Sequence, residues 1–216
     1  MKRACAYCGE SVTARHKGHV VSNCLYPSST PTEVQRPTVP ECENCRALWT
    51  EPETQFRNIL VIAGEQNRAT EETWETIQRS FTKPSGKKWV DDIYESMSPV
   101  ATKSGQRYMV YPHKDLRVNL VLRKIVRGLS AYHGVGEFIP DDHVWVGCAP
   151  AAIPDESLPY NLGKEFMRYG YALFDAEIEL CSGWLFRFYD SRDFLGIVAK
   201  STEEKLAFAS IFNPPS

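Results

Sequence analysis

The sequence has no long uninterrupted hydrophobic run. No window approaches the roughly 18 consecutive apolar residues that a membrane-spanning helix needs. The first residues, Met-Lys-Arg-Ala-Cys, are not followed by an apolar stretch, so they lack the pattern of a secretory signal peptide. We therefore expect a cytoplasmic protein without a membrane segment. Nothing in the sequence indicates its oligomeric state.

The sequence also has little net charge. Its formal net charge is −2, so overall charge gives no argument for nucleic-acid binding. Charge is nevertheless uneven, because a basic stretch, residues 103–127, precedes an acidic one, residues 137–179. A hydrophobic content of 43% and a charged content of 24% are typical of a globular protein. The 216 residues suit one large domain or two small ones.

The pattern of a disulfide framework is absent as well. The seven cysteines are an odd number, and four of them stand in Cys-x-x-Cys pairs. This combination favours a reducing compartment and metal binding over disulfide bonds. We predict that the other three, Cys24, Cys148 and Cys181, are buried or half-buried free thiols.

The two cysteine pairs organise the amino-terminal part of the chain. Cys5 and Cys8 are separated by two residues, as are Cys42 and Cys45, so both thiols of a pair can face one point. Zinc takes four such thiolates in a tetrahedron. The other interpretation of one pair alone, buried or redox-active cysteines, is weakened by the second pair. The sequence therefore predicts one structural zinc site, with a long polar insert between the pairs.

Hydrophobic periodicity and turn residues predict the elements that follow. We expect a short hairpin over residues 12–21, with His19 near the start of its second strand. A proline-rich loop then covers residues 27–40. A helix that begins at Thr50 and ends at Gly64 follows. Further short helices are predicted over residues 71–81 and 89–97, and a loop over residues 98–106.

The clearest predicted helix spans residues 115–133. Its apolar residues share one face, and four cations, Arg117, Arg123, Lys124 and Arg127, share another. These cations are either a solvated helix face or a stripe that contacts phosphates. Aromatic and β-branched runs then predict four strands joined as an antiparallel meander, with the helix covering one face of the sheet. The strands are expected at residues 143–148, 166–174, 184–189 and 194–199.

The first 60 residues or so resemble HNH-endonuclease-like proteins. The matching motifs, in order, are Cys5-x-x-Cys8, His19-Val20 followed by Cys24-Leu25-Tyr26-Pro27, Val39-Pro40-x-Cys42-x-x-Cys45, and Glu53-x-x-Phe56. The resemblance implies a zinc-stapled ββα fold of the treble-clef type around a catalytic metal. It implies that His19 activates water, that an acid beside it helps to bind Mg²⁺, and that an asparagine after the second cysteine pair completes the site.

Three positions depart from that pattern. Gly18 stands where the family has an acid, Ser22 where it often has proline, and Arg46 where it has asparagine. His16, Asn23, Glu43 and Asn44 are the candidates that can replace the lost groups in space. We also expect that an aspartate placed at position 18 would raise activity by restoring the carboxylate.

We therefore expect an α+β protein in three parts. These are a zinc-stapled, HNH-like ββα unit over residues 1–65, a helical connector over residues 66–99, and an α+β domain over residues 100–216, built as an antiparallel sheet with a covering helix. The predicted function is that of a divergent HNH-like endonuclease that cleaves DNA with a divalent metal.

The residues of the predicted site have separate roles. His19 would be the general base, with His16 or Asn44 helping to hold Mg²⁺ or Mn²⁺. Arg15, Lys17 and Arg46, with the four helix cations, would contact nucleic acid. Two alternatives stay open. One is a zinc-stapled nucleic-acid-binding module without catalysis, and the other is a protein-interaction adaptor that uses the acidic, strand-rich carboxy-terminal part.

Overall fold

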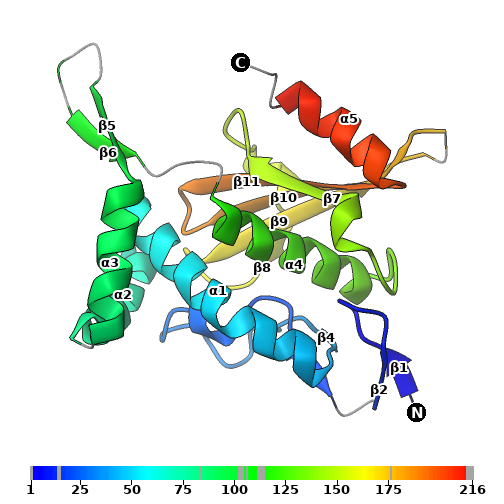
Figure 1. The fold of residues 1–216 in the computed structure, drawn as a ribbon, viewed down its shortest axis with the longest axis horizontal. Helices are drawn as coiled ribbons and strands as arrows, with labels where there is room; N and C mark the ends of the chain where they lie inside the picture. The colour runs from blue at the N-terminus through cyan, green and yellow to red at the C-terminus, as the bar shows by residue number, and fades with distance from the viewer. Residues whose placement is uncertain are drawn as a thin grey trace.

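The computed structural model describes residues 2–13, 16–82, 84–101, 105, 107–110, 115–175 and 177–212. Within these residues the protein is a mixed α/β structure with five α-helices and a five-stranded antiparallel sheet. The sheet and helix α4 form the centre, and the amino-terminal unit packs against the other side of that helix (Figure 1). None of the helices described is long and apolar enough to cross a membrane.

Two separate hairpins and one long helix make up the amino-terminal unit. Strand β1 pairs with β2, and β3 pairs with β4, so the hairpin predicted within residues 12–21 is wrong. The first cysteine pair lies in the β1–β2 connection and the second follows β4, and a backbone hydrogen bond from Ala6 to Pro40 (2.9 Å) joins the two hairpins. The elements are β1 (Lys2–Ala4), β2 (Ser11–Thr13), β3 (Lys17–His19), η1 (Asn23–Leu25), β4 (Thr38–Pro40) and α1 (Glu43–Ala63).

Helix α1 begins one residue after Cys42, seven residues before its predicted start at Thr50. The Cys42 thiol caps the helix by accepting the backbone N–H of Cys45 (3.4 Å). The cap signal at Thr50 and the proline at position 52 therefore lie inside a continuous helix. The cysteine pair sets the start of the helix, because it satisfies a first-turn N–H that would otherwise lack a partner.

The helical connector is followed by a small hairpin. Helix α2 (Arg68–Phe81) starts with a capping box between Asn67 and Thr70, and α3 (Pro84–Ser96) packs beside it. Strands β5 (Ser98–Ala101) and β6 (Arg107–Val110) pair, so part of the loop predicted over residues 98–106 is a strand. This hairpin extends away from the rest of the fold (Figure 1).

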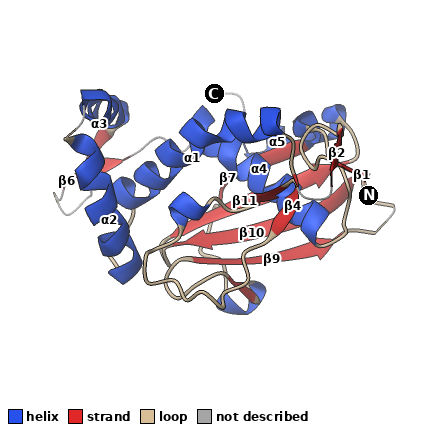
Figure 2. Cartoon of the chain, turned by 90° about the horizontal axis from the view of Figure 1, so that it is seen from below, coloured by secondary structure: helices blue, strands red, loops and turns tan. Residues whose placement is uncertain are grey.

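The five-stranded sheet has the order β7-β11-β10-β9-β8, and every neighbouring pair is antiparallel. Strands β9, β10 and β11 form a meander as predicted, whereas the first predicted strand, β7, pairs with β11 at the far edge and not with β9 (Figure 2). The sequence analysis missed β8 and the last helix, α5, which packs Phe208 on Trp145. The elements are η2 (Asp141–His143), β7 (Val144–Cys148), η3 (Asp155–Ser157), β8 (Tyr160–Asn161), β9 (Met167–Leu173), β10 (Leu180–Phe188), β11 (Arg192–Ala199) and α5 (Thr202–Phe212).

Helix α4 (Leu116–Tyr132) lies between the sheet and the amino-terminal unit (Figure 1). On the sheet side, a Cβ at Gly196 would lie 2.7 Å from Val126, so glycine permits the close approach of helix and strand. On the opposite side, a Cβ at Gly128 would lie 2.7 Å from Val20. The hydrophobic core therefore continues from the amino-terminal unit through α4 to the sheet.

The cations of α4 do not form the exposed stripe that was considered from the sequence. Lys124 and Arg127 are only 3% and 4% exposed. Arg127 donates to the carbonyls of Tyr7 and Ile139, and Arg123 pairs with Asp141 (2.9 Å). Arg117 pairs with Asp115 (2.6 Å) at the start of the helix. The amino-terminal unit packs on this side of α4 and buries Lys124 and Arg127. Helix periodicity alone cannot predict that contact.

The three cysteines outside the pairs are free thiols. Cys24 and Cys181 are half-buried, as predicted. Cys148 is exposed, so the prediction is wrong for that residue, which is the last residue of the edge strand β7.

Candidate metal centre and polar cavity

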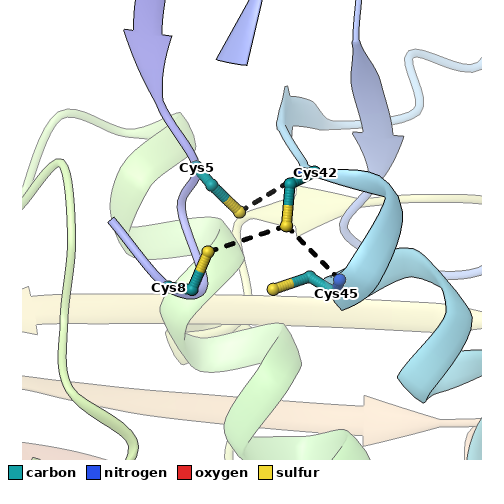
Figure 3. A group of neighbouring side chains, drawn as sticks. All are labelled: Cys5, Cys8, Cys42 and Cys45. Carbon is teal, nitrogen blue, oxygen red and sulfur yellow. Dashed lines mark hydrogen bonds between the residues drawn. The ribbon is translucent and has the colours of Figure 1, made fainter. Parts of the chain in front are cut away.

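The four paired cysteines converge on one point (Figure 3). Cys5 and Cys8 come from the β1–β2 connection, and Cys42 and Cys45 come from the start of α1. Their sulfur atoms all lie within 4.8 Å of one another, and those of Cys8 and Cys42 are 3.6 Å apart. A tetrahedron with Zn–S bonds of about 2.3 Å places sulfurs about 3.8 Å apart. The cluster therefore fits a structural zinc ion, as the spacing predicted.

Backbone groups hold these sulfurs in place. The N–H of Cys42 donates to the Cys5 sulfur at 3.4 Å, and the N–H of Cys45 donates to the Cys42 sulfur at the same distance. Gly9 closes the turn after Cys8 with φ of 76°. Burial and the neighbouring thiols raise the pKa of Cys45. A bound cation would favour the thiolate form of this thiol.

A polar cavity of about 320 Å³ lies between β3, the first half of α1 and α4. It collects side chains that are far apart in the sequence, and most of them are polar or charged. Its lining residues are Lys17, Gly18, His19, Ser22, Asn23, Glu41, Arg46, Trp49, Thr50, Glu53 and Lys124.

His19 is the last residue of β3 and is half-buried in this cavity. Its backbone carbonyl accepts from the Lys124 ammonium (3.1 Å), whereas its ring Nδ1 is buried and has no partner in the described part of the chain. Burial lowers the pKa of His19, and the positive charges of Arg36, Lys124 and Arg46 lower it further. The imidazole is therefore neutral at neutral pH and can accept a proton.

Glu41 is the functional candidate that the sequence analysis missed. Glu41 is the unspecified position before Cys42 in the zinc motif, so the sequence offers no reason to select it. Its position in the folded structure does. The side chain is 4% exposed, and one carboxylate oxygen lies 3.4 Å from Arg46 Nε. The other oxygen is buried and has no partner among the described residues. Burial raises the pKa of Glu41 by more than the charges of Lys124 and Arg46 lower it.

The Glu41 carboxylate fills the space beside Gly18. A Cβ at position 18 would overlap a Glu41 carboxylate oxygen and would lie 2.9 Å from the Glu41 Cβ. The acid that the sequence lacks at position 18 is thus present in the same space, contributed by the residue after β4. An aspartate at position 18 has no room, which removes the basis for expecting it to raise activity.

We predict that Gly18→Ala destabilises the protein by about 1–3 kcal/mol, the usual cost of overpacking. The matched control is Gly136→Ala, whose Cβ would meet Ile139 at an ordinary 3.5 Å and should change stability by less than about 0.5 kcal/mol. Urea denaturation measures both. Adding Glu41→Ala to Gly18→Ala should recover part of the loss, because the two residues share one space. Strict additivity of the two changes would contradict this geometry.

Lys124 brings α4 into the cavity. Its ammonium pairs with Glu53 and lies 5.6 Å and 5.9 Å from the ring centroids of Tyr7 and Trp49. The Trp49 indole N–H is buried, and no described residue accepts a hydrogen bond from it. Glu53 belonged to the resembled motif, but nothing in the local sequence links it to a lysine 71 positions further along the chain.

The structure brings some of the other predicted site residues together and separates the rest. Lys17 and Arg46 line the cavity, and Arg46 donates to the Lys17 carbonyl (2.9 Å). His16 and Asn44 are exposed and do not line it. Arg117, Arg123 and Arg127 also lie outside its lining. Arg15 lies outside the described residues.

The cavity offers few ligands to a second metal ion. Over the described residues, the four cysteines are the only group of three or more Cys, His, Asp or Glu donors placed closely enough for an ion. Mg²⁺ commonly binds through one or two carboxylates and completes its shell with water and phosphate oxygens. The unpartnered oxygen of Glu41 fits that kind of site.

A larger cavity, of about 540 Å³, lies between α1, α4 and the β7–β11 edge. Apolar groups such as Ile59, Val118 and Phe194 form much of its lining. Its acid, Asp193, already pairs with Arg187 (2.7 Å). We therefore take the smaller polar cavity as the candidate functional site.

No family model, curated protein or solved structure matches this chain.

Proposed function

We propose that this chain is a divalent-metal-dependent phosphodiesterase of the HNH-endonuclease-like type that cleaves DNA. The observation that carries the proposal is a pair of buried, unpaired polar atoms in one cavity. Among the residues that the structure describes, the Nδ1 atom of His19 and one carboxylate oxygen of Glu41 have no partner, although burying such groups unpaired costs free energy. A water molecule and a cation are the ligands that would satisfy them.

His19 is the proposed general base. Its neutral ring can take a proton from water while the water oxygen forms a bond to phosphorus. The bond from phosphorus to the sugar oxygen breaks, and that oxygen takes a proton from solvent. The carbonyl of His19 is bound to Lys124, which restricts the backbone that carries the ring.

Glu41 is the proposed carboxylate ligand, and it replaces the acid missing at position 18. When bound, a divalent cation would neutralise the charge that develops on the phosphate. Arg46 contacts Glu41 and borders the cavity, together with Lys17, so both can approach phosphate oxygens. The zinc cluster would fix the start of α1, and therefore Arg46 and Trp49, in position relative to β3.

Nicking of supercoiled plasmid tests the proposal. The zinc-loaded protein should nick DNA with Mg²⁺ or Mn²⁺, should stop when EDTA is added, and should recover when excess Mg²⁺ is returned. Zinc content measured before and after EDTA shows that the structural ion has stayed in place. Absence of cleavage with every divalent ion tried, in protein that retains its zinc, would reject catalysis and favour the binding module.

A further inference from the structure

We infer that Trp49 and Lys124 form an oxyanion subsite in the polar cavity, which takes a phosphate group of the ligand. The inference rests on the proposed function in taking a phosphodiester as that ligand. It adds a residue from α4 and an indole N–H to a site otherwise built from the amino-terminal unit.

The two donors are buried side by side. Trp49 is 7% exposed and Lys124 is 3% exposed, and the Lys124 ammonium lies 5.9 Å from the centroid of the Trp49 ring. Both line the cavity. His19 and Glu41 line the same cavity, so its lining combines donors for an anion with groups that can bind water or a cation.

Protein stability alone does not account for this arrangement. A buried N–H without a partner costs about 1–3 kcal/mol, and the Trp49 indole N–H has none within the described ranges of the chain. The Lys124 ammonium has three N–H groups, and its two oxygen partners, Glu53 and the His19 carbonyl, use two of them. A phosphate oxygen can accept from the third and from the indole.

The charge of the lining favours an anion. Three cations, Lys17, Arg46 and Lys124, stand against two carboxylates, Glu41 and Glu53, and leave one net positive charge. A divalent ion held by Glu41 would raise that charge further. Without α4 the cavity would lack Lys124, and its lining would have no net positive charge. The subsite therefore needs both the amino-terminal unit and α4.

The test follows the five tryptophan indole N–H signals of the full-length, zinc-loaded protein by ¹H–¹⁵N NMR during titration with inorganic phosphate. We expect the Trp49 signal to shift saturably. The Trp184 signal should stay in place, because that N–H already donates to Ser182 (2.9 Å). The signal lost in Trp49→Phe assigns the resonance. A Trp49 signal that does not move at saturating phosphate would overturn the subsite.

Variants separate the subsite from a structural role. Trp49→Phe keeps a ring against Tyr7 and removes the N–H, and should weaken phosphate binding about threefold to tenfold. Trp89→Phe is the matched control, because that indole N–H is also buried and unpartnered but lies outside the cavity. Lys124→Met should weaken binding by about tenfold or more. Its fold is checked by whether the Trp184 signal keeps its position.

The outcomes also separate this inference from the proposed function. Phosphate binding at Trp49 in a protein that never nicks DNA would keep the subsite and reject catalysis. Metal-dependent nicking in a protein whose Trp49→Phe variant binds phosphate as tightly as the wild type would keep catalysis and reject the subsite.

Discussion

Replacing His19 with alanine is expected to lower plasmid nicking by about 10²–10⁴-fold, the usual contribution of a positioned general base. The fold should persist, because His19 is half-buried and its contact with Lys124 is made by the backbone carbonyl. Zinc content and thermal denaturation of the variant check that its structure is intact. Cleavage that survives in His19→Ala would exclude the residue as the base.

His16→Ala is the informative control. The sequence analysis gave His16 a role in metal binding, whereas the structure places its exposed side chain outside the cavity lining. The geometry therefore predicts little change in nicking. An equal loss in both variants would mean that the cavity, as it stands in this structure, does not represent the reacting site.

The pH dependence should report the same group. The base acts in its deprotonated form, and burial together with three nearby cations lowers the pKa of His19 below its ordinary 6.5. Nicking should therefore rise with pH along a limb whose midpoint lies below 6.5 and remain high at neutral pH. A midpoint above 6.5 would indicate a different base.

Loss of the zinc site is expected to unfold the amino-terminal unit. Structural zinc contributes about 10–16 kcal/mol of apparent binding free energy in small zinc-binding peptides, which exceeds the total stability of many domains. Cys42→Ser removes a zinc ligand but keeps a side-chain oxygen that can cap α1 by accepting the Cys45 N–H, so the loss of stability reports on zinc. Zinc stoichiometry by elemental analysis and thermal denaturation measure the effect.

The matched control for that variant is Cys181→Ser. Cys181 is a half-buried free thiol outside the cluster, so its replacement should leave one zinc per chain. Wild-type protein that contains no zinc, has all four paired thiols free and melts at the same temperature as the zinc-loaded form would contradict the structural role.

Local patterns in the sequence were sufficient for much of the fold. The Cys-x-x-Cys spacing predicted the four-sulfur cluster, because two residues between thiols let a tight turn bring them together. Aromatic and β-branched runs predicted the long strands, and helical periodicity predicted α4 to within a residue at each end. Such patterns work where an element has one buried face that its own residues reveal.

The same reasoning failed where a distant contact overrides a local signal. Thr50 has the features of a helix start, yet the Cys42 cap places the beginning of α1 earlier. Val12 and Val20 suggested one hairpin, yet β2 and β3 each pair with a different strand. Both elements lie beside the cysteine cluster, which is formed by residues far apart in the sequence. A local pattern cannot show such a contact.

For the site, the sequence by itself determined the zinc ligands and pointed to His19, since both belong to short motifs. Only the tertiary structure decided that Glu41 fills the space beside Gly18, and that Lys124 is buried against Glu53. It also decided that Arg127 is bound to Tyr7 and is not on an exposed face. The physical reason is that the role of a charged side chain depends on how far it is desolvated and on which groups it contacts. For these three residues, segments distant in the sequence provide both the burial and the contacts.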